Sequence, residues 1–408
     1  MTGGRSTTKP AGRASKHWID LVTAPLWSAG FRAFFWLAAL NVVASLATWV
    51  AFLSGAAIPV QGWPPQSLHA HEMIYGTVVP VIAGFLLTAV PNWTSTPPLR
   101  GRPVMALVAL WFAGRMALAL GDFLPREAVL VIDVAFLPVL AAVVGVPIVR
   151  ARKPRNLPVV ALLLGLALAN FAMHRGLIAH DALLMRNGAI ASVYLAIFLV
   201  LLISGRIVPL FTRNALRKSG LSAAVEPNTT VGALALTAAG FAFVFDLASP
   251  GSVPGAWMAL VTAPLLIARQ LFWGPAYTAG RPILWVLHAG HAWIAVGFAC
   301  QAAAVLWSAI PLSSALHAFT AGALGCIMLG MMTRVSLGHT GRPVKASALT
   351  IVAYTCVIGA AGVRVFGGAL APAMLLEVYQ LSGVAFALGY AIFAAEFTPV
   401  LWGGRADG

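Results

Sequence analysis

Apolar residues run along this chain in long, nearly uninterrupted blocks that are separated by short polar segments. A membrane-spanning helix needs roughly 20 apolar residues, and on that measure the pattern predicts twelve spans. Their expected bounds are 30–53, 69–90, 103–121, 127–149, 157–174, 187–210, 229–247, 255–273, 283–307, 312–336, 347–367 and 372–401. The sequence therefore predicts an all-α fold, a polytopic integral membrane bundle of helices.

Composition and charge support this prediction. The chain is 60% hydrophobic and only 9% charged, whereas about a quarter of the residues in a soluble domain are charged. Its net charge of +15 does not indicate a nucleic-acid partner, because the cations lie in short loops as the positive-inside rule requires. One set of alternate loops and the two tails hold most of the Lys and Arg residues, while the opposite loops hold only Arg126, Arg175 and Arg186. This asymmetry predicts an even number of spans, with both termini in the cytoplasm and lipid as the surrounding partner.

The first 20 residues differ from the rest of the chain. They are rich in Gly, Ser and Thr, carry four Lys or Arg residues, and lack the short apolar core of a signal peptide. We expect a disordered basic tail over 1–20 and a single transmembrane domain over 21–408. Cys300, Cys326 and Cys356 are isolated in apolar blocks, so neither disulfides nor thiolate metal sites are expected.

Three titratable residues, His69, His71 and Glu72, stand at the start of the second predicted span. Such groups are costly at a membrane boundary and mark a functional site by default. At 100° per residue, His69 and His71 point about 200° apart, whereas His69 and Glu72 lie about 60° apart. The two imidazoles cannot bind one metal from an ideal helix. Either the helix begins after His69 or the two histidines serve different partners; the alternative is a pair of interfacial residues bonded to water and backbone.

The other histidines divide between the two membrane faces. The predicted topology gathers five of the nine near the outer face: His69, His71, His174, His180 and His317. His288 and His291 lie three residues apart on one face of the ninth span, near the cytoplasmic side. That pair suits one metal, one side of a cofactor, or polar contacts with neighbouring helices. Neutral imidazole is a ligand for haem iron and copper.

Arginines within the spans need partners as well. Arg32 and Arg115 lie deep enough to require a carboxylate, a carbonyl or an anionic cofactor group. Arg206 and Arg334 lie close enough to the cytoplasmic ends of their spans to extend their charges towards water.

Four sequence blocks together resemble the NnrS family. They are Pro25–Phe35, His69–Met73 with Ala83–Thr94, Gly205–Thr212, and Met332–Pro343. The resemblance implies a bacterial inner-membrane protein of twelve spans that contains haem b and copper. It also implies a role in the response to nitric oxide and nitrosative stress, often beside denitrification, without defining a reaction.

The family motifs also imply a set of site residues, which are His69, His71, Glu72, His288, His317, Arg32, Arg206 and Arg334. His291 is added to this set on spacing alone. We assign His71 and His317 as metal ligands on the outer side, with His69 and His174 as candidates for copper. His288, with His291, would serve a second site or the opposite axial position of the haem. Arg32 or Arg115 would pair with haem propionates, and Glu72 would orient a histidine.

The leading hypothesis is a protein that binds nitric oxide or a nitrosylated iron species and disposes of it, using an unidentified electron donor. Whether it turns over as an enzyme is left open. The alternatives are a small-molecule transporter and a haem-based nitric oxide sensor without turnover. A transporter predicts two related halves, and no such repeat is evident between residues 1–204 and 205–408.

Overall fold

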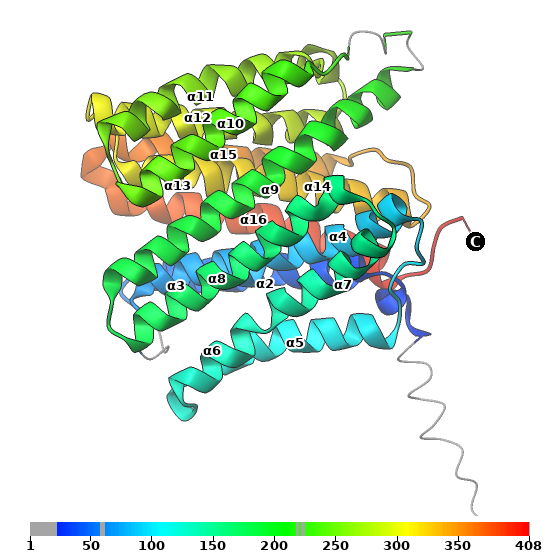
Figure 1. The fold of residues 1–408 in the computed structure, drawn as a ribbon, viewed down its shortest axis with the longest axis horizontal. Helices are drawn as coiled ribbons and strands as arrows, with labels where there is room; N and C mark the ends of the chain where they lie inside the picture. The colour runs from blue at the N-terminus through cyan, green and yellow to red at the C-terminus, as the bar shows by residue number, and fades with distance from the viewer. Residues whose placement is uncertain (1–22, 58–61, 218–219, 222–224, 408) are drawn as a thin grey trace, which may run out of the picture.

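Each long apolar block of the sequence forms a helix in the computed structural model (Figure 1), which describes residues 23–57, 62–217, 220–221 and 225–407. The predicted tail over 1–20 lies outside the described residues. Eleven helical segments in the described part are long and apolar enough to cross a membrane. A further long helix, α11, ends in Arg269 and Gln270, which make it less apolar. With α11, these segments match the twelve predicted spans, and the fold is all-α and polytopic as expected.

The spans have the following bounds. They are α2 (Gly30–Leu53), α3 (Pro65–His71) continuing through η2 (Glu72–Val78) into α4 (Val79–Thr94), α5 (Arg102–Ala119), α6 (Arg126–Val134) with α7 (Phe136–Arg150), α8 (Leu157–Ile178), α9 (Ala182–Leu216), α10 (Thr229–Ala248), α11 (Val253–Leu271), α12 (Pro282–Leu306), α13 (Leu312–His317) continuing through η8 (Ala318–Leu324) into α14 (Gly325–His339), α15 (Ala348–Leu370) and α16 (Leu375–Trp402).

Local sequence explains where many of these helices begin. The side chains of Asp181, Asn228, Ser252 and Ser347 accept hydrogen bonds from backbone N–H groups in the first turns of α9, α10, α11 and α15. Such caps satisfy amides that have no partner inside the helix. Proline occupies the first turn of α3 and α12, where its missing N–H costs nothing.

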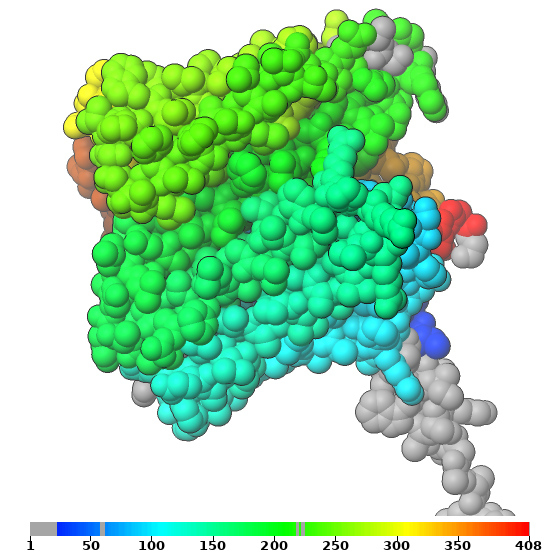
Figure 2. Space-filling model, in the orientation of Figure 1, coloured from blue at the N-terminus to red at the C-terminus, as the bar shows by residue number. Residues whose placement is uncertain are grey.

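The helices form a closed bundle. The last helix, α16, packs along the first, α2, which in turn packs against α4, while α11 packs along α12. On the face in Figure 2, the segments coloured green and cyan cover most of α2, α4 and α16. Leu168 and Val244 are 68% and 62% exposed, as expected for apolar side chains that face lipid. The second and tenth spans are the most enclosed, each 78% buried over its most apolar stretch.

Two of the spans share an unusual feature, a π-helical segment that begins directly after a histidine. The segment η2 follows His71 in the second span, and η8 follows His317 in the tenth. Pro80 has no N–H and its ring crowds the carbonyl of Gly76, so α-helical hydrogen bonding cannot continue unchanged there. Wide turns of this kind are frequent at functional sites, so the histidines beside them are candidate site residues.

Candidate metal and cofactor sites

A cavity of about 390 Å³ lies between the second and tenth spans. Side chains from α2, α3, α9, α13, α14, α15 and α16 line it, together with residues of both π segments. Its volume falls in the range of small-molecule and cofactor sites. Most of the lining is apolar or aromatic, including Leu46, Met73, Leu324, Met328 and Phe386.

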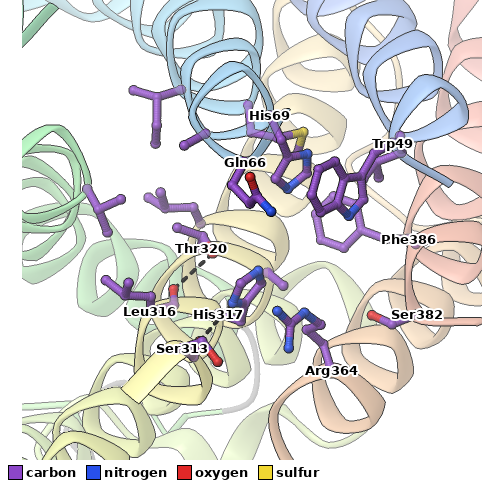
Figure 3. Close-up of a pocket in the computed structure, with 18 of the residues that line it drawn as sticks. Trp49, Gln66, His69, Ser313, Leu316, His317, Thr320, Arg364, Ser382 and Phe386 are labelled. Atoms are coloured by element: carbon purple, nitrogen blue, oxygen red, sulfur yellow. Dashed lines mark hydrogen bonds between the residues drawn. The ribbon is translucent and has the colours of Figure 1, made fainter. Parts of the chain in front are cut away.

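His69 and His317 both face this cavity, His69 from α3 and His317 from the end of α13 (Figure 3). The Nδ1 of His317 lies 2.7 Å from the carbonyl oxygen of Ser313. Because a carbonyl only accepts hydrogen bonds, Nδ1 carries the proton and Nε2 keeps a free lone pair. The ring of His69 stacks on Trp49 with centroids 4.4 Å apart, and its buried Nδ1 has no hydrogen-bond partner among the described residues. Both imidazoles can therefore offer a nitrogen to a metal.

The cavity also contains one cation, Arg364 of α15, which lies below His317 in Figure 3. Its Cζ lies 3.8 Å from the centroid of the Tyr379 ring. No carboxylate belongs to the described lining, so the charge of Arg364 is available to an anionic group of a ligand.

His71 points away from that cavity into a separate buried cluster. Its Nε2 lies 3.0 Å from Asp133 Oδ2 and 2.9 Å from Asn170 Oδ1, and its Nδ1 lies 3.2 Å from Glu72 Oε1. The Nε2 of His174 lies 3.0 Å from the same Asp133 oxygen. The angular argument from the sequence is confirmed, because His69 and His71 share one helix yet serve different partners. His71, Asp133 and His174 place one ligand atom each within 4.8 Å of the others.

Charges balance within this cluster. Arg115 forms an ion pair with Asp133 and another, at 3.3 Å, with Glu72. Of the kinds of partner expected for Arg115, the structure shows carboxylates. Both nitrogens of His71 face carboxylate oxygens, and an ionised carboxylate can accept hydrogen bonds but not donate them. In this arrangement His71 carries two protons, and it and Arg115 neutralise the two carboxylates. A metal at this position would replace the Nε2 protons of His71 and His174.

Close packing holds the cluster in place. The ring of Trp63 lies 5.1 Å from that of His71 and 5.3 Å from that of His174, measured between centroids. A Cβ at Gly114 would meet the Asp133 side chain and backbone, so only glycine allows α5 to approach α6 this closely. The cluster is closely packed, and His71 is fully buried.

His288 and His291 lie apart from both sites. His288 Nε2 contacts Thr212 Oγ1 at 3.0 Å, and the His291 ring packs on Trp273. The buried Arg269 lies over the same tryptophan, and among the described residues its Nη1, His288 Nδ1 and His291 Nε2 lack hydrogen-bond partners. A guanidinium in this position opposes a metal cation, so metal binding by the pair stays a prediction without added support.

The three arginines that the motifs singled out occupy separate places. Arg32 donates to the backbone carbonyls of Val400, Leu401 and Gly403. Arg206 donates to Asn156 and to the carbonyl of Arg155, and Arg334 lies over the ring of Phe211. None of the three lines the cavity between His69 and His317. Their assignment to a cofactor stays a prediction, and the arginine that lines this cavity is Arg364.

Sequence reasoning did not assign Asp133, Asn170 or Arg364 to a site. Asp133 could have been found, because a carboxylate in the middle of an apolar block is costly without a partner. Asn170 precedes His174 by four residues on α8, which places both on one helical face. Arg364, like Arg115, is an arginine within an apolar block, and it needs a partner for the same reason.

The fold and these clusters define a multi-pass α-helical membrane protein with a buried group of side chains that could bind a metal. Residues 25–405 match the family model described as NnrS protein, so the chain belongs to the NnrS family. This membership confirms the resemblance seen in the sequence and supports a membrane protein of the nitric oxide response. A search of curated proteins found no match.

Proposed function

We propose that this protein binds haem b in the cavity between the second and tenth spans, with His69 and His317 as iron ligands. A second metal, copper, would lie at His71, Asp133 and His174. With these groups the protein would bind and detoxify nitric oxide or a nitrosylated iron species. The observation that carries the proposal is the meeting of two imidazoles, from distant parts of the chain, in one apolar cavity.

The residues present fit a haem. A porphyrin needs an apolar, partly aromatic enclosure, which Trp49, Met73, Met328 and Phe386 provide. Its propionates need a cation, and Arg364 has no carboxylate partner in the described lining. The bond from His317 Nδ1 to the Ser313 carbonyl orients the ring and increases its strength as a ligand. When bound, the iron would supply a coordination site at which nitric oxide would replace one of the two imidazoles.

The second site fits a metal ion rather than an organic cofactor. Imidazole ligands suit copper as well as zinc and iron, and we propose copper because the family resemblance implies it. Glu72 and Arg115 would hold His71 and Asp133 in place and balance their charge, and Trp63 would exclude water. The proposal thus exchanges the roles first assigned to His69 and His71, because the helix turns them in opposite directions.

Spectra and metal analysis of the purified protein test this proposal. We expect a Soret band, b-type bands on reduction, and both iron and copper in the sample. His69→Ala and His317→Ala should each lower the haem content or change its spin state. His180→Asn is the matched control, because His180 is exposed and has a φ of 55°, a conformation that asparagine tolerates.

The outcomes separate the alternatives. A folded wild-type protein without colour or metal would contradict the proposal and favour a transporter. Unchanged spectra in both histidine variants would show that the ligand assignment is wrong. Consumption of nitric oxide by the reduced, metal-loaded protein, with a chemical reductant in place of the unidentified electron donor, separates detoxification from sensing.

A further inference from the structure

A second cavity, of about 260 Å³, lies at the opposite end of the bundle, where α2 begins and α4 and α14 end. It is separate from the two sites described above. Its lining comes from three chain segments and from Arg405 near the C-terminus: Ser28, Ala29, Phe31 and Arg32; Leu87, Thr88, Pro91, Asn92, Thr96, Pro98, Leu99 and Arg100; and His339. Parts of three of the four sequence blocks singled out above therefore meet here, and the proposed function uses none of these lining residues.

The lining carries basic side chains and no carboxylate among its described residues. Arg405 is already neutralised, because its Nε and Nη2 lie 2.8 and 2.6 Å from the oxygens of Asp407. Arg32 and Arg100 have no carboxylate partner in the described part of the chain. Two positive charges thus remain beside the cavity without a counter-charge.

Of these two arginines, Arg32 gives the stronger evidence for a binding site. Its side chain is only 2% exposed, and all of its hydrogen bonds to backbone carbonyls come from Nη1. Its Nε and Nη2 make no hydrogen bond to the described residues, although the residue lines the cavity. Because Nη1 already anchors the side chain, these two nitrogens remain free to donate to an acceptor that enters the cavity.

The start of α2 adds a positive field from the backbone. This helix is 24 residues long, its N-cap Ala29 has no side chain to cap the first amides, and its first turn contains no acidic residue. Ala29, Phe31 and Arg32 all line the cavity. An uncapped N-terminus together with an arginine is the combination that binds anions in many proteins.

We propose that this cavity binds an oxyanion group, held by Arg32, Arg100 and the first turn of α2. The volume is below the range of drug-sized ligand sites, so the ligand is a small group such as a phosphate. Because the cavity lies at the end of the bundle, that group belongs either to a free ion or to the headgroup of an anionic lipid. Both sources would present a compact oxyanion to the cavity.

Titration of the full-length protein in detergent with inorganic phosphate, at constant ionic strength adjusted with chloride, tests the site. Arg100→Gln is the main variant, because the exposed Arg100 side chain can change without disturbing the core. We expect at least a tenfold loss of affinity in Arg100→Gln and a larger loss in Arg32→Gln. Arg102→Gln should bind like wild type, because Arg102 is a nearby exposed arginine that does not line the cavity.

A second measurement distinguishes the two sources of the oxyanion. The protein is placed in nanodiscs of phosphatidylcholine or of phosphatidylglycerol, and phosphate binding is measured again. Weaker binding in phosphatidylglycerol, absent in Arg100→Gln, would identify a lipid headgroup as the ligand; equal binding would identify a free ion. The proposal is overturned if wild-type protein does not bind phosphate in detergent or in either kind of nanodisc. It is also overturned if Arg102→Gln loses as much affinity for phosphate as Arg100→Gln.

Discussion

The rings of His71 and His174 lie edge to face with centroids 5.4 Å apart, and both Nε2 atoms meet the same oxygen of Asp133. The two histidines come from the second and fifth spans, so the carboxylate joins segments that are distant in the sequence. This arrangement makes the proposed copper site testable without disturbing the proposed haem cavity.

The first prediction concerns that separation. In His174→Gln we expect the copper content to fall by more than half while the haem content stays at the wild-type level, because the glutamine amide can still donate to Asp133 but is a poor ligand. Metal analysis and the Soret absorbance of one preparation measure both quantities. Equal loss of haem and copper would mean that the two metals do not occupy separate sites.

A second prediction concerns Arg364. Replacement by glutamine removes the cation that would pair with a haem propionate, and a charged hydrogen bond contributes about 1.5–3 kcal/mol. We expect haem affinity to fall by about tenfold or more, with the absorption maxima unchanged because both histidines remain. Haem transfer to an excess of apomyoglobin measures the loss.

Arg175→Gln is the matched control, since Arg175 is an exposed arginine of α8 outside the cavity lining. If both variants release haem at the wild-type rate, Arg364 is not a propionate partner.

Glycine substitutions provide a third prediction. A Cβ at Gly114 would overlap the Asp133 side chain, so Gly114→Ala should destabilise the protein by roughly 1–3 kcal/mol and lower its copper content. A Cβ at Gly362 meets no atom within 4 Å. There, alanine should be neutral or stabilise the helix by up to about 1 kcal/mol. Thermal unfolding in detergent compares the two; a stable Gly114→Ala with normal copper would contradict the packing argument.

The fourth prediction is a pH dependence at the C-terminus, outside the spans. The hydrogen bond and the charge of Arg405 lower the pKa of Asp407 from its ordinary value. The contact between them is therefore fully present above the ordinary carboxyl pKa and is lost as the pH falls through the lowered one. An NMR titration of the Asp407 carboxyl carbon should show this, and the pKa should return upwards in Arg405→Gln. A carboxyl that titrates identically in both proteins would exclude the contact.

The spans were predictable because lipid requires long apolar helices with internally satisfied backbones, and the first predicted span, 30–53, coincides with α2. It was also predictable that the side chains of His69 and His71 point in different directions, because helical periodicity fixes the relative direction of side chains on one helix. Periodicity does not identify the facing helix, so the partners of Asp133 and Asn170 could not be assigned. The π segments were not predicted. Pro80 is a local cause of η2, but this segment also depends on tertiary contacts such as the amide of Asn41, which donates to the Glu72 carbonyl at 3.3 Å.

The wide turn after His317 contains more backbone per turn than an α-helix, and this excess has a consequence for engineering and evolution. Deleting a single residue within Ala318–Leu324 would let the backbone recover regular pitch. The helical stretches on either side would keep their relative direction, because the wide turn already absorbs the extra residue. The same deletion in a regular helix would instead rotate one flank by about 100° relative to the other. The loss of one codon here would therefore narrow the turn beside His317 while the rest of the span stays in register.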